Sequence, residues 1–245
     1  MRTIAPLTQN PKGTLLKVLA SLLLALPWLN PFATGPSPAI VPWLFSLCCA
    51  AASIVLLSGA SRSRLAKIAA WAWLGAASLS AGIGLLQYFG VASHLSPWVN
   101  VTTAGDAYAN LRQRNQFATL TNIGLAALIW ASLHWGARQG PMPAVDTVHS
   151  EKPHGRALSA ASLAAAALLA VGNAASSSRT GLVQLVVLIV LFAFWGGWRL
   201  PKGRRILLAA ALAYLAGTVA LPVLAGLDPS STGLLARLHD AGPAC

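Results

Sequence analysis

Residues 65–89 read LAKIAAWAWLGAASLSAGIGLLQYF, an apolar run in which Lys67 is the only charged side chain. An α-helix rises about 1.5 Å per residue, so about 20 such residues cross the hydrocarbon core of a bilayer, which is roughly 30 Å thick. Within lipid, the backbone N–H and C=O groups must bond to each other inside the segment, which a lone strand does not allow. The run therefore predicts a membrane-spanning helix.

Six further apolar runs of comparable length accompany this one, and together they predict an all-α, polytopic transmembrane helix bundle of about seven spans. The predicted spans are residues 14–30, 39–58, 65–89, 116–135, 157–175, 180–198 and 205–226. They form a single transmembrane domain over residues 1–245. The first run is interrupted by Pro27 and Pro31, and its basic start followed by an apolar stretch also fits a signal peptide. The fifth run is rich in alanine, so we expect it inside the bundle, where small side chains let helices approach closely.

The composition agrees with a membrane protein and excludes other classes. Hydrophobic residues make up 56% of the chain and charged residues 9%, whereas about a quarter of an average soluble domain is charged. This hydrophobicity also excludes an intrinsically disordered chain. The formal net charge of +12 is scattered between apolar runs, unlike the basic helix or finger of a nucleic-acid-binding protein. Cys48 and Cys49 are adjacent in an apolar run, so we expect small core residues rather than disulfides.

The basic residues predict the orientation of the spans. With the N-terminus in the cytoplasm, 13 of the 17 Lys and Arg residues lie on the cytoplasmic side, as the positive-inside rule requires. These residues are Arg2, Lys12, Lys17, Arg62, Arg64, Lys67, Arg138, Lys152, Arg156, Arg199, Lys202, Arg204 and Arg205. We therefore expect a multi-pass protein with a cytoplasmic N-terminus.

Four basic residues remain on the outward side, and all are arginines: Arg112, Arg114, Arg179 and Arg237. Two of them precede the fourth predicted span, and Arg179 lies at the start of the sixth, where Ser177 or Ser178 would cap the helix. A helix N-terminus carries about half a positive charge and free N–H groups, so it attracts anions and repels a cation such as Arg179. A bound anion would relieve that repulsion.

These arginines predict an anion site if the fourth and sixth spans are neighbours. Arg112, Arg114 and Arg179 would then converge and fit a phosphate or pyrophosphate, because guanidinium offers paired donors that match phosphate oxygens. Neutral side chains nearby could orient phosphate or sugar hydroxyls: Gln113, Asn115, Gln116, Asn173 and Ser178. The alternative also stays open that the arginines extend separately to lipid headgroups, or that Asp106 pairs with Arg112.

Other chemistry finds little support in the sequence. The chain has no GxSxG, HExxH, Walker or GxGxxG motif, and its histidines are too scattered for the convergent ligands of a metal site. His94 and Ser96 lack a third partner for a nucleophilic triad. Arg237, with His239 and Asp240, is expected in a solvated segment after the last span. We expect no metal and no cofactor.

Two short motifs resemble those of a known enzyme family. Residues 110–118, NLRQRNQFA, and residues 176–181, SSSRTG, are similar to the paired motifs of bacterial protein O-oligosaccharyltransferases, relatives of the O-antigen ligases and polymerases. The resemblance implies transfer of an oligosaccharide from undecaprenyl pyrophosphate to a protein Ser or Thr, or to a lipid A core sugar, at the periplasmic face of the inner membrane. The implied partners are the lipid-linked donor, the acceptor and membrane lipids, without nucleic acid.

The resemblance also implies roles for individual residues. Arg179, with Arg112 or Arg114, would hold the pyrophosphate, and Gln113 and Asn115 would orient sugar or phosphate. No metal is implied, because arginine serves where other transferases use a divalent ion. Family members are much longer and carry, in a later periplasmic loop, a histidine thought to activate the acceptor. We therefore expect this chain to be the N-terminal part of a longer ligase, without that general base.

Non-enzymatic alternatives stay open beside the enzyme. One is a transporter or flippase for an anionic lipid-linked substrate. A proton-coupled transporter normally buries acidic or histidine residues at mid-membrane, whereas all five acidic residues fall in predicted loops. Another is a structural bundle that binds a partner, in which the outward arginines would lie apart.

Overall fold

The computed structural model describes residues 11–30, 40–111, 113–136 and 153–227. Within these ranges the protein contains seven α-helices, two short 3-10 helices and no strand. The α-helices are α1 Pro11–Leu29, α2 Ile40–Leu57, α3 Arg62–Tyr88, α4 Arg114–Gly136, α5 Pro153–Ala175, α6 Arg179–Phe194 and α7 Pro201–Leu224; the 3-10 helices are η1 Ala92–Leu95 and η2 Gly197–Arg199. Each α-helix coincides with one predicted span, which confirms the all-α prediction.

The helix lengths and their apolar exteriors make this a multi-pass membrane protein. Four helices, α2, α3, α4 and α7, are long and apolar enough to cross a membrane. The apolar parts of the other three are shorter: Thr14–Leu29, Ala160–Ala175 and Arg179–Phe194. Large hydrophobic side chains are exposed along the helices, as on α6 at Val183, Val187 and Val190. A soluble monomer rarely exposes so continuous an apolar surface, whereas lipid covers it without cost.

Several helix ends differ from the predicted spans by up to four residues, and three of these differences have local backbone reasons. α6 ends at Phe194, short of residue 198, because Gly196 adopts a φ of 72° in the left-handed region. α7 begins at Pro201, ahead of residue 205, since proline lacks the N–H that the first helical turn leaves unbonded. α4 begins at Arg114, ahead of residue 116, because the Gln113 carbonyl accepts two N–H groups of the first turn. The hydropathy of the sequence does not change clearly at these turns, so it does not show where each helix begins or ends.

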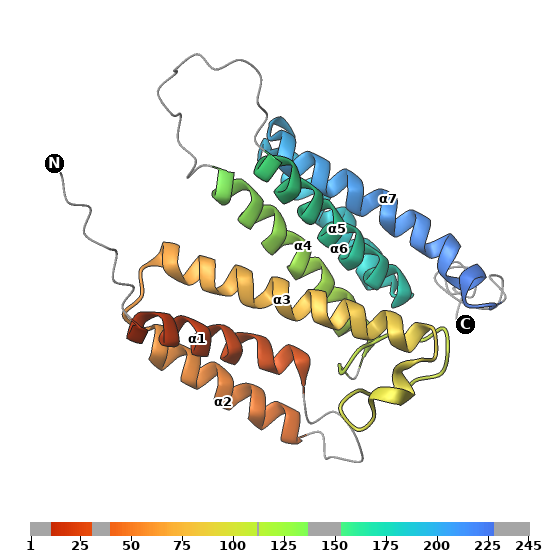
Figure 1. The fold of residues 1–245 in the computed structure, drawn as a ribbon, viewed down its shortest axis with the longest axis horizontal. Coiled ribbons are helices and arrows are strands. Elements are labelled where there is room, and N and C mark those ends of the chain that lie inside the picture. The colour runs from red at the N-terminus through yellow and green to blue at the C-terminus, as the bar shows by residue number, and fades with distance from the viewer. Residues whose placement is uncertain (1–10, 31–39, 112, 137–152, 228–245) are drawn as a thin grey trace, which may run out of the picture.

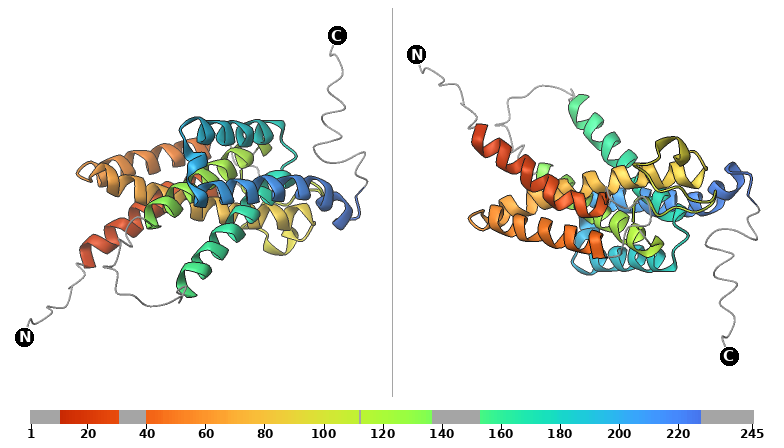
Figure 2. Two further views of the ribbon diagram at one scale, coloured as in Figure 1. Left: turned by 90° about the horizontal axis from the view of Figure 1, so that it is seen from above. Right: turned by 90° about the horizontal axis from the view of Figure 1, so that it is seen from below.

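The helices are arranged around α3 and α5. Figure 1 shows α1 and α2 on one side of α3 and the later helices on the other. α3 packs against α1, α4 and α5, while α5 contacts α3, α4, α6 and α7. The views in Figure 2 show the same grouping from above and below. The expectation that the alanine-rich span lies inside the bundle is confirmed for residues 166–175 of α5, which are largely buried, whereas Leu163 and Ala164 in its first half are exposed.

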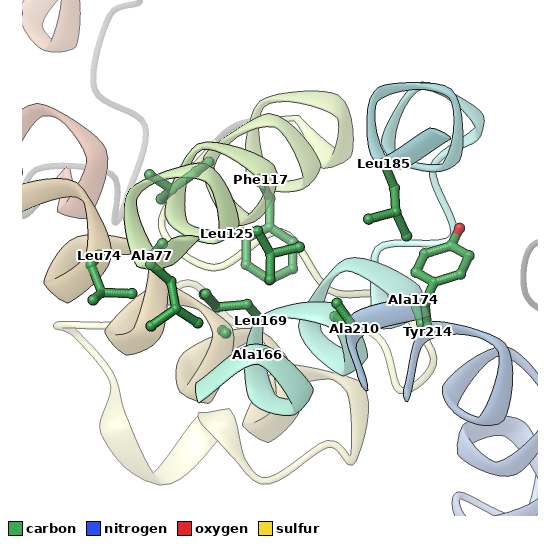
Figure 3. Packing of buried hydrophobic residues seen from close by; sticks show 14 of the residues in the cluster. Leu74, Ala77, Phe117, Leu125, Ala166, Leu169, Ala174, Leu185, Ala210 and Tyr214 are labelled. Carbon is green, nitrogen blue, oxygen red and sulfur yellow. The ribbon is translucent and has the colours of Figure 1, made fainter. Parts of the chain in front are cut away.

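The core combines a few large side chains with many alanines. Phe117 and Leu125 of α4 and Leu169 of α5 are fully buried where α3, α4 and α5 meet (Figure 3). The cysteine expectation is right for Cys49, which is buried, and wrong for Cys48, which is exposed on the surface of α2. Adjacent residues on a helix point about 100° apart, so a single face cannot bury both.

Close approach of three helices depends on two glycines. A Cβ atom at Gly124 of α4 would lie 2.5 Å from the Cβ atom of Ala77 on α3. A Cβ atom at Gly172 of α5 would lie 2.8 Å from the Cβ atom of Ala81, also on α3. Contacts this short do not occur, so glycine is needed at both positions if the helices are to keep their spacing.

One end of the bundle contains the described connection between α3 and α4. α3 and α5 end there, and the parallel helices α4 and α6 begin there (Figure 1). Segment 89–111, between α3 and α4, reaches the end of α1 because the Asn30 side-chain amide donates to the carbonyl of Asn110 at 3.2 Å. It also approaches the residues after α7, since a Cβ atom at Gly105 would lie 2.8 Å from Leu227 Cδ1. We call this the 89–111 end.

The glycine contacts generate a prediction about stability. Gly172→Val is expected to lower the free energy of unfolding by about 1–3 kcal/mol, because the added side chain forces α5 away from the α3 backbone. The matched control is Gly82→Val on α3, where an added Cβ atom meets nothing within 4 Å. Unfolding of the detergent-solubilised protein, followed by circular dichroism, measures both. Equal losses for the two variants would contradict the packing described here.

Candidate functional site

The site at the 89–111 end is built on a buried glutamine, Gln87, near the end of α3. Its Nε2 group donates to the carbonyls of Asn100 at 2.9 Å and Ala109 at 2.8 Å. Its Oε1 atom accepts from the backbone N–H groups of Tyr108 at 3.1 Å and Ala109 at 2.6 Å. The side chain is fully buried, so these four bonds replace bonds to water. They hold Asn100 close to residues 108–109 of the same segment. The sequence analysis missed Gln87, although a glutamine inside an apolar run is the available signal.

A second buried amide, Asn110, completes this framework. Its Nδ2 group donates to the carbonyl of Trp98 at 2.8 Å, and its Oδ1 atom accepts from the backbone N–H of Asn100 at 3.1 Å. Its own carbonyl accepts from Asn30 after α1. Asn110 opens the NLRQRNQFA motif, so the first residue of that motif sets the path of the chain into α4. Its role is structural.

The start of α4 carries an ion pair. Arg114, the first residue of α4, pairs with Asp106 of segment 89–111 at 2.5 Å between Nη2 and Oδ1. The two side chains are 25% and 31% exposed, so the pair lies at the surface of the protein. The sequence suggested Arg112 as the partner of Asp106; Asp106 pairs with Arg114, and Arg112 lies outside the described residues. Gln113 is exposed and caps the helix with its carbonyl.

The start of α6 carries an arginine without an acidic neighbour among the described residues. Ser178 is the N-cap residue, and its Oγ atom accepts from the backbone N–H of Gly181 at 3.3 Å, which confirms the predicted cap. Arg179 is the first helical residue and is exposed. Asp106 is the only acidic side chain in the described ranges, and it pairs with Arg114. Arg179 therefore adds its positive charge to that of the helix N-terminus without compensation by a described residue.

A direct hydrogen bond joins the two helix starts. The Ser178 hydroxyl donates to the Asn115 Oδ1 atom at 2.7 Å. Asn115 follows Arg114 in the chain and Ser178 precedes Arg179, so each arginine lies one residue from the bonded pair. This contact confirms the expectation that the fourth and sixth spans are neighbours.

Further polar contacts continue between α4 and α6 below this bond. The Gln184 amide donates to the Thr119 hydroxyl at 2.9 Å, and the Asn122 amide donates to the Gly181 carbonyl at 3.1 Å. The α4 residues are four and then three positions apart, which is the spacing of one helix face. We name the whole set the polar seam: Asn115, Thr119 and Asn122 of α4 with Ser178, Gly181 and Gln184 of α6.

Asn173 of α5 lies beneath the polar seam and not at its surface. Its side chain is fully buried, and its amide lies 3.4 Å from the Gly181 carbonyl. The expectation that Asn173 binds a sugar hydroxyl is therefore wrong, because the bundle covers it. Among the predicted neutral residues, Gln113, Asn115 and Gln116 are exposed beside the helix starts, whereas Ser178 is buried as a cap.

The remaining candidates form no second site within the described part of the chain. Among the described residues, no three His, Cys, Asp or Glu side chains gather as a metal site requires. His94 is exposed on η1, and His134 stacks on Trp130 with ring centroids 4.1 Å apart. Arg237 lies outside the described residues.

Comparison with known proteins adds one finding. A family model described as protein glycosylation ligase matches residues 107–130, which cover the end of segment 89–111 and most of α4. No curated protein and no solved structure matches the chain. The match contains the 110–118 motif, which supports the resemblance found in the sequence, whereas the 176–181 motif lies outside the matched residues.

The Gln87 framework predicts a change in backbone protection. Gln87→Leu is expected to speed hydrogen exchange at the Tyr108 and Ala109 amides about tenfold or more, because their buried N–H groups lose their acceptor. Gln116→Leu, at an exposed position on α4, is the matched control. Exchange measured by mass spectrometry on the detergent-solubilised protein tests this. Unchanged protection in Gln87→Leu would show that the segment is held by other contacts.

The Asn115–Ser178 bond predicts coupling between the two helix starts. Asn115→Ala and Ser178→Ala are each expected to lower the free energy of unfolding by about 1 kcal/mol, with the larger loss at Ser178, because that change also removes the cap. The loss of unfolding free energy in the double variant should be smaller than the sum of the two single losses, because each single variant already breaks the same bond. Thr180→Ala, at an exposed neighbouring position, is the control. Strictly additive losses would contradict a direct bond.

Proposed function

We propose that the protein is a membrane glycosyltransferase that moves an oligosaccharide from an undecaprenyl-pyrophosphate carrier to an acceptor hydroxyl. The acceptor is a protein Ser or Thr, or a sugar of the lipid A core, at the periplasmic face of the inner membrane. The match of residues 107–130 to the protein glycosylation ligase model supports the reaction class. The observation that carries the proposal is the Asn115–Ser178 hydrogen bond, which holds the N-termini of α4 and α6 together.

The proposed donor site uses the charge at these two helix starts. Parallel helices that begin side by side present two positive dipole ends, each of which attracts an anion. Arg179 adds a guanidinium with no described acidic partner, and Arg114 adds another that Asp106 partly neutralises. Arg112, between segment 89–111 and α4, is proposed as the third. A pyrophosphate carries the charge and the oxygen atoms that paired guanidinium donors recognise.

The proposed chemistry is a displacement at the anomeric carbon of the first sugar. The acceptor oxygen forms a bond to C1 while the bond between C1 and the phosphate oxygen breaks. The electron pair goes to undecaprenyl pyrophosphate, and the proton of the acceptor hydroxyl passes to solvent water. Arg179 would stabilise the negative charge that develops on the leaving pyrophosphate, which is an electrostatic task of the oxyanion type. Gln113 and Asn115 would orient phosphate or sugar, with Ser178 holding Asn115 in place.

The proposed orientation places the 89–111 end in the periplasm and the N-terminus in the cytoplasm. It rests on the excess of basic residues at the opposite end, as on α3 at Arg62, Arg64 and Lys67 and on α7 at Arg204 and Arg205. Undecaprenyl-linked donors present their glycans on the outward leaflet in this proposal, so the arginines and the donor share one face.

A transporter fits the described residues less well. Ion-coupled transport requires a titratable group inside the membrane, which is normally an acidic residue or a histidine. In the described ranges no Asp or Glu lies in an α-helix, and the histidines of the α-helices, His134 and His154, lie in the last turn of α4 and the first turn of α5. The anion site at the helix starts is therefore better suited to holding a leaving group than to coupling with protons.

The decisive experiment removes Arg179. Arg179→Ala in the full-length protein is expected to reduce glycan transfer about 100-fold or more, because the leaving pyrophosphate loses a charged donor. Arg179→Lys should also impair transfer, since lysine does not reproduce the paired donors of guanidinium. Transfer is measured by the mobility shift of the acceptor in cells whose own ligase is deleted, with membrane insertion checked by fractionation.

The control is Arg199→Ala, which removes the same charge beyond the other end of α6. It is expected to leave transfer unchanged, because it lies far from the helix start in sequence and at the opposite end of the helix. Normal transfer in Arg179→Ala would refute the anion-site assignment.

A further inference from the structure

Residues 91–101 of segment 89–111 expose four large apolar side chains close together in the chain. Their exposed fractions are 44% at Val91, 42% at Leu95, 74% at Trp98 and 59% at Val101. Residues 89–101 contain no Lys, Arg, Asp or Glu, so this part of the segment lacks the charges typical of a loop in water. We call these four side chains the 91–101 surface. Exposed apolar surface of this kind marks an interaction site.

The 91–101 surface is held outward by the framework of the segment. Ala92 and Val99 are buried and occupy the inward positions between the exposed residues. The carbonyl of Trp98 is bound by the Asn110 amide at 2.8 Å, and Gln87 holds the residues that follow. These bonds fix the backbone at Trp98 and therefore the direction of its Cα–Cβ bond. Its exposure is therefore a stable property of the fold.

Helix lengths place the segment at the boundary of the hydrocarbon core. Gln87 lies 20 residues after Lys67 on α3, which corresponds to about 30 Å of helix rise and to the thickness of that core. α4 repeats this spacing between Arg114 and His134. The chain thus leaves α3 and enters α4 at the level of the lipid headgroups. Tryptophan is most stable at this depth, because its ring is apolar and its N–H is polar.

The apolar face of α3 continues into the 91–101 surface. Leu79, Leu86 and Phe89 are exposed at 55%, 40% and 41%, and their spacing of seven and three residues keeps them on one helix face. This face belongs to a helix long enough to cross the membrane, so lipid covers it. η1 follows directly and stays beside the end of α3 (Figures 1 and 2). We therefore expect lipid to cover the exposed side chains from Val91 onward as well.

We propose that the 91–101 surface lies in the headgroup region of the bilayer and anchors the 89–111 end at a fixed depth. Its partner is the lipid surface itself. The anchor holds the N-termini of α4 and α6 at the level where lipid phosphates carry their charge. This inference does not depend on the proposed enzyme, because it is drawn from exposed apolar surface and helix lengths alone.

The test attaches an environment-sensitive fluorophore to the surface. Cys48, Cys49 and Cys245 are replaced by alanine, and NBD is coupled to Trp98→Cys in the full chain. The protein is reconstituted in vesicles of phosphatidylethanolamine and phosphatidylglycerol. The matched control is Thr103→Cys, an exposed polar position in the same segment. At position 98 we expect blue-shifted emission that is lost with doxyl-labelled lipid and is insensitive to iodide, with the reverse at position 103.

Leu95→Cys provides a second position in case replacement of Trp98 disturbs folding, and it should give the same result as position 98. Iodide quenching at positions 95 and 98 as strong as at position 103 would overturn the proposal, because the surface would then face water. Protection from both quenchers would also overturn it, because a polypeptide and not lipid would then cover the surface.

Discussion

The structure depends on one constraint, which is that a polar group buried among apolar helices loses its solvation, and a hydrogen bond within the protein offsets that loss. Water is absent from the bilayer core, so an unpaired amide there loses its solvation without compensation. Gln87 meets this constraint with four bonds to segment 89–111. The same requirement acts between α4 and α6, where polar side chains of α4 bond to Ser178, to the Gln184 side chain and to the Gly181 carbonyl. These hydrogen bonds set the positions of segment 89–111 and of the starts of α4 and α6.

Small residues and polar residues have different roles in the packing of the helices. Glycine and alanine contacts between α3, α4 and α5 set how closely the helices approach, but they are apolar and allow sliding. The polar seam sets the register, because a hydrogen bond tolerates little displacement. Together they place two parallel helix starts side by side, with Arg114 and Arg179 as their first residues. Such an arrangement concentrates positive potential, which makes the end suited to an anion.

Particular residues show where prediction from sequence reached its limit. The cap at Ser178 was predictable because a serine before an apolar run has few other roles at that place. The ion-pair partner of Asp106 was not predictable, because Arg112 and Arg114 are both near it in the chain. The backbone path of segment 89–111 places Asp106 beside Arg114. Asn173 resembled a surface donor in the sequence, yet α5 turns it beneath Gly181. The end of α6 was missed because a backbone turn at Gly196 leaves hydropathy unchanged.

The amino-acid sequence by itself determined the helical class, the seven apolar runs and the presence of Arg114 and Arg179 at the starts of two of them. These properties follow from local hydrophobicity and charge, which act on each segment separately. Only the tertiary structure decided that α4 and α6 touch, that Ser178 bonds to Asn115 and that Gln87 clamps the segment after α3. Each of these contacts joins residues from separate elements, and the pairing of distant polar groups depends on helix packing, which no local pattern encodes.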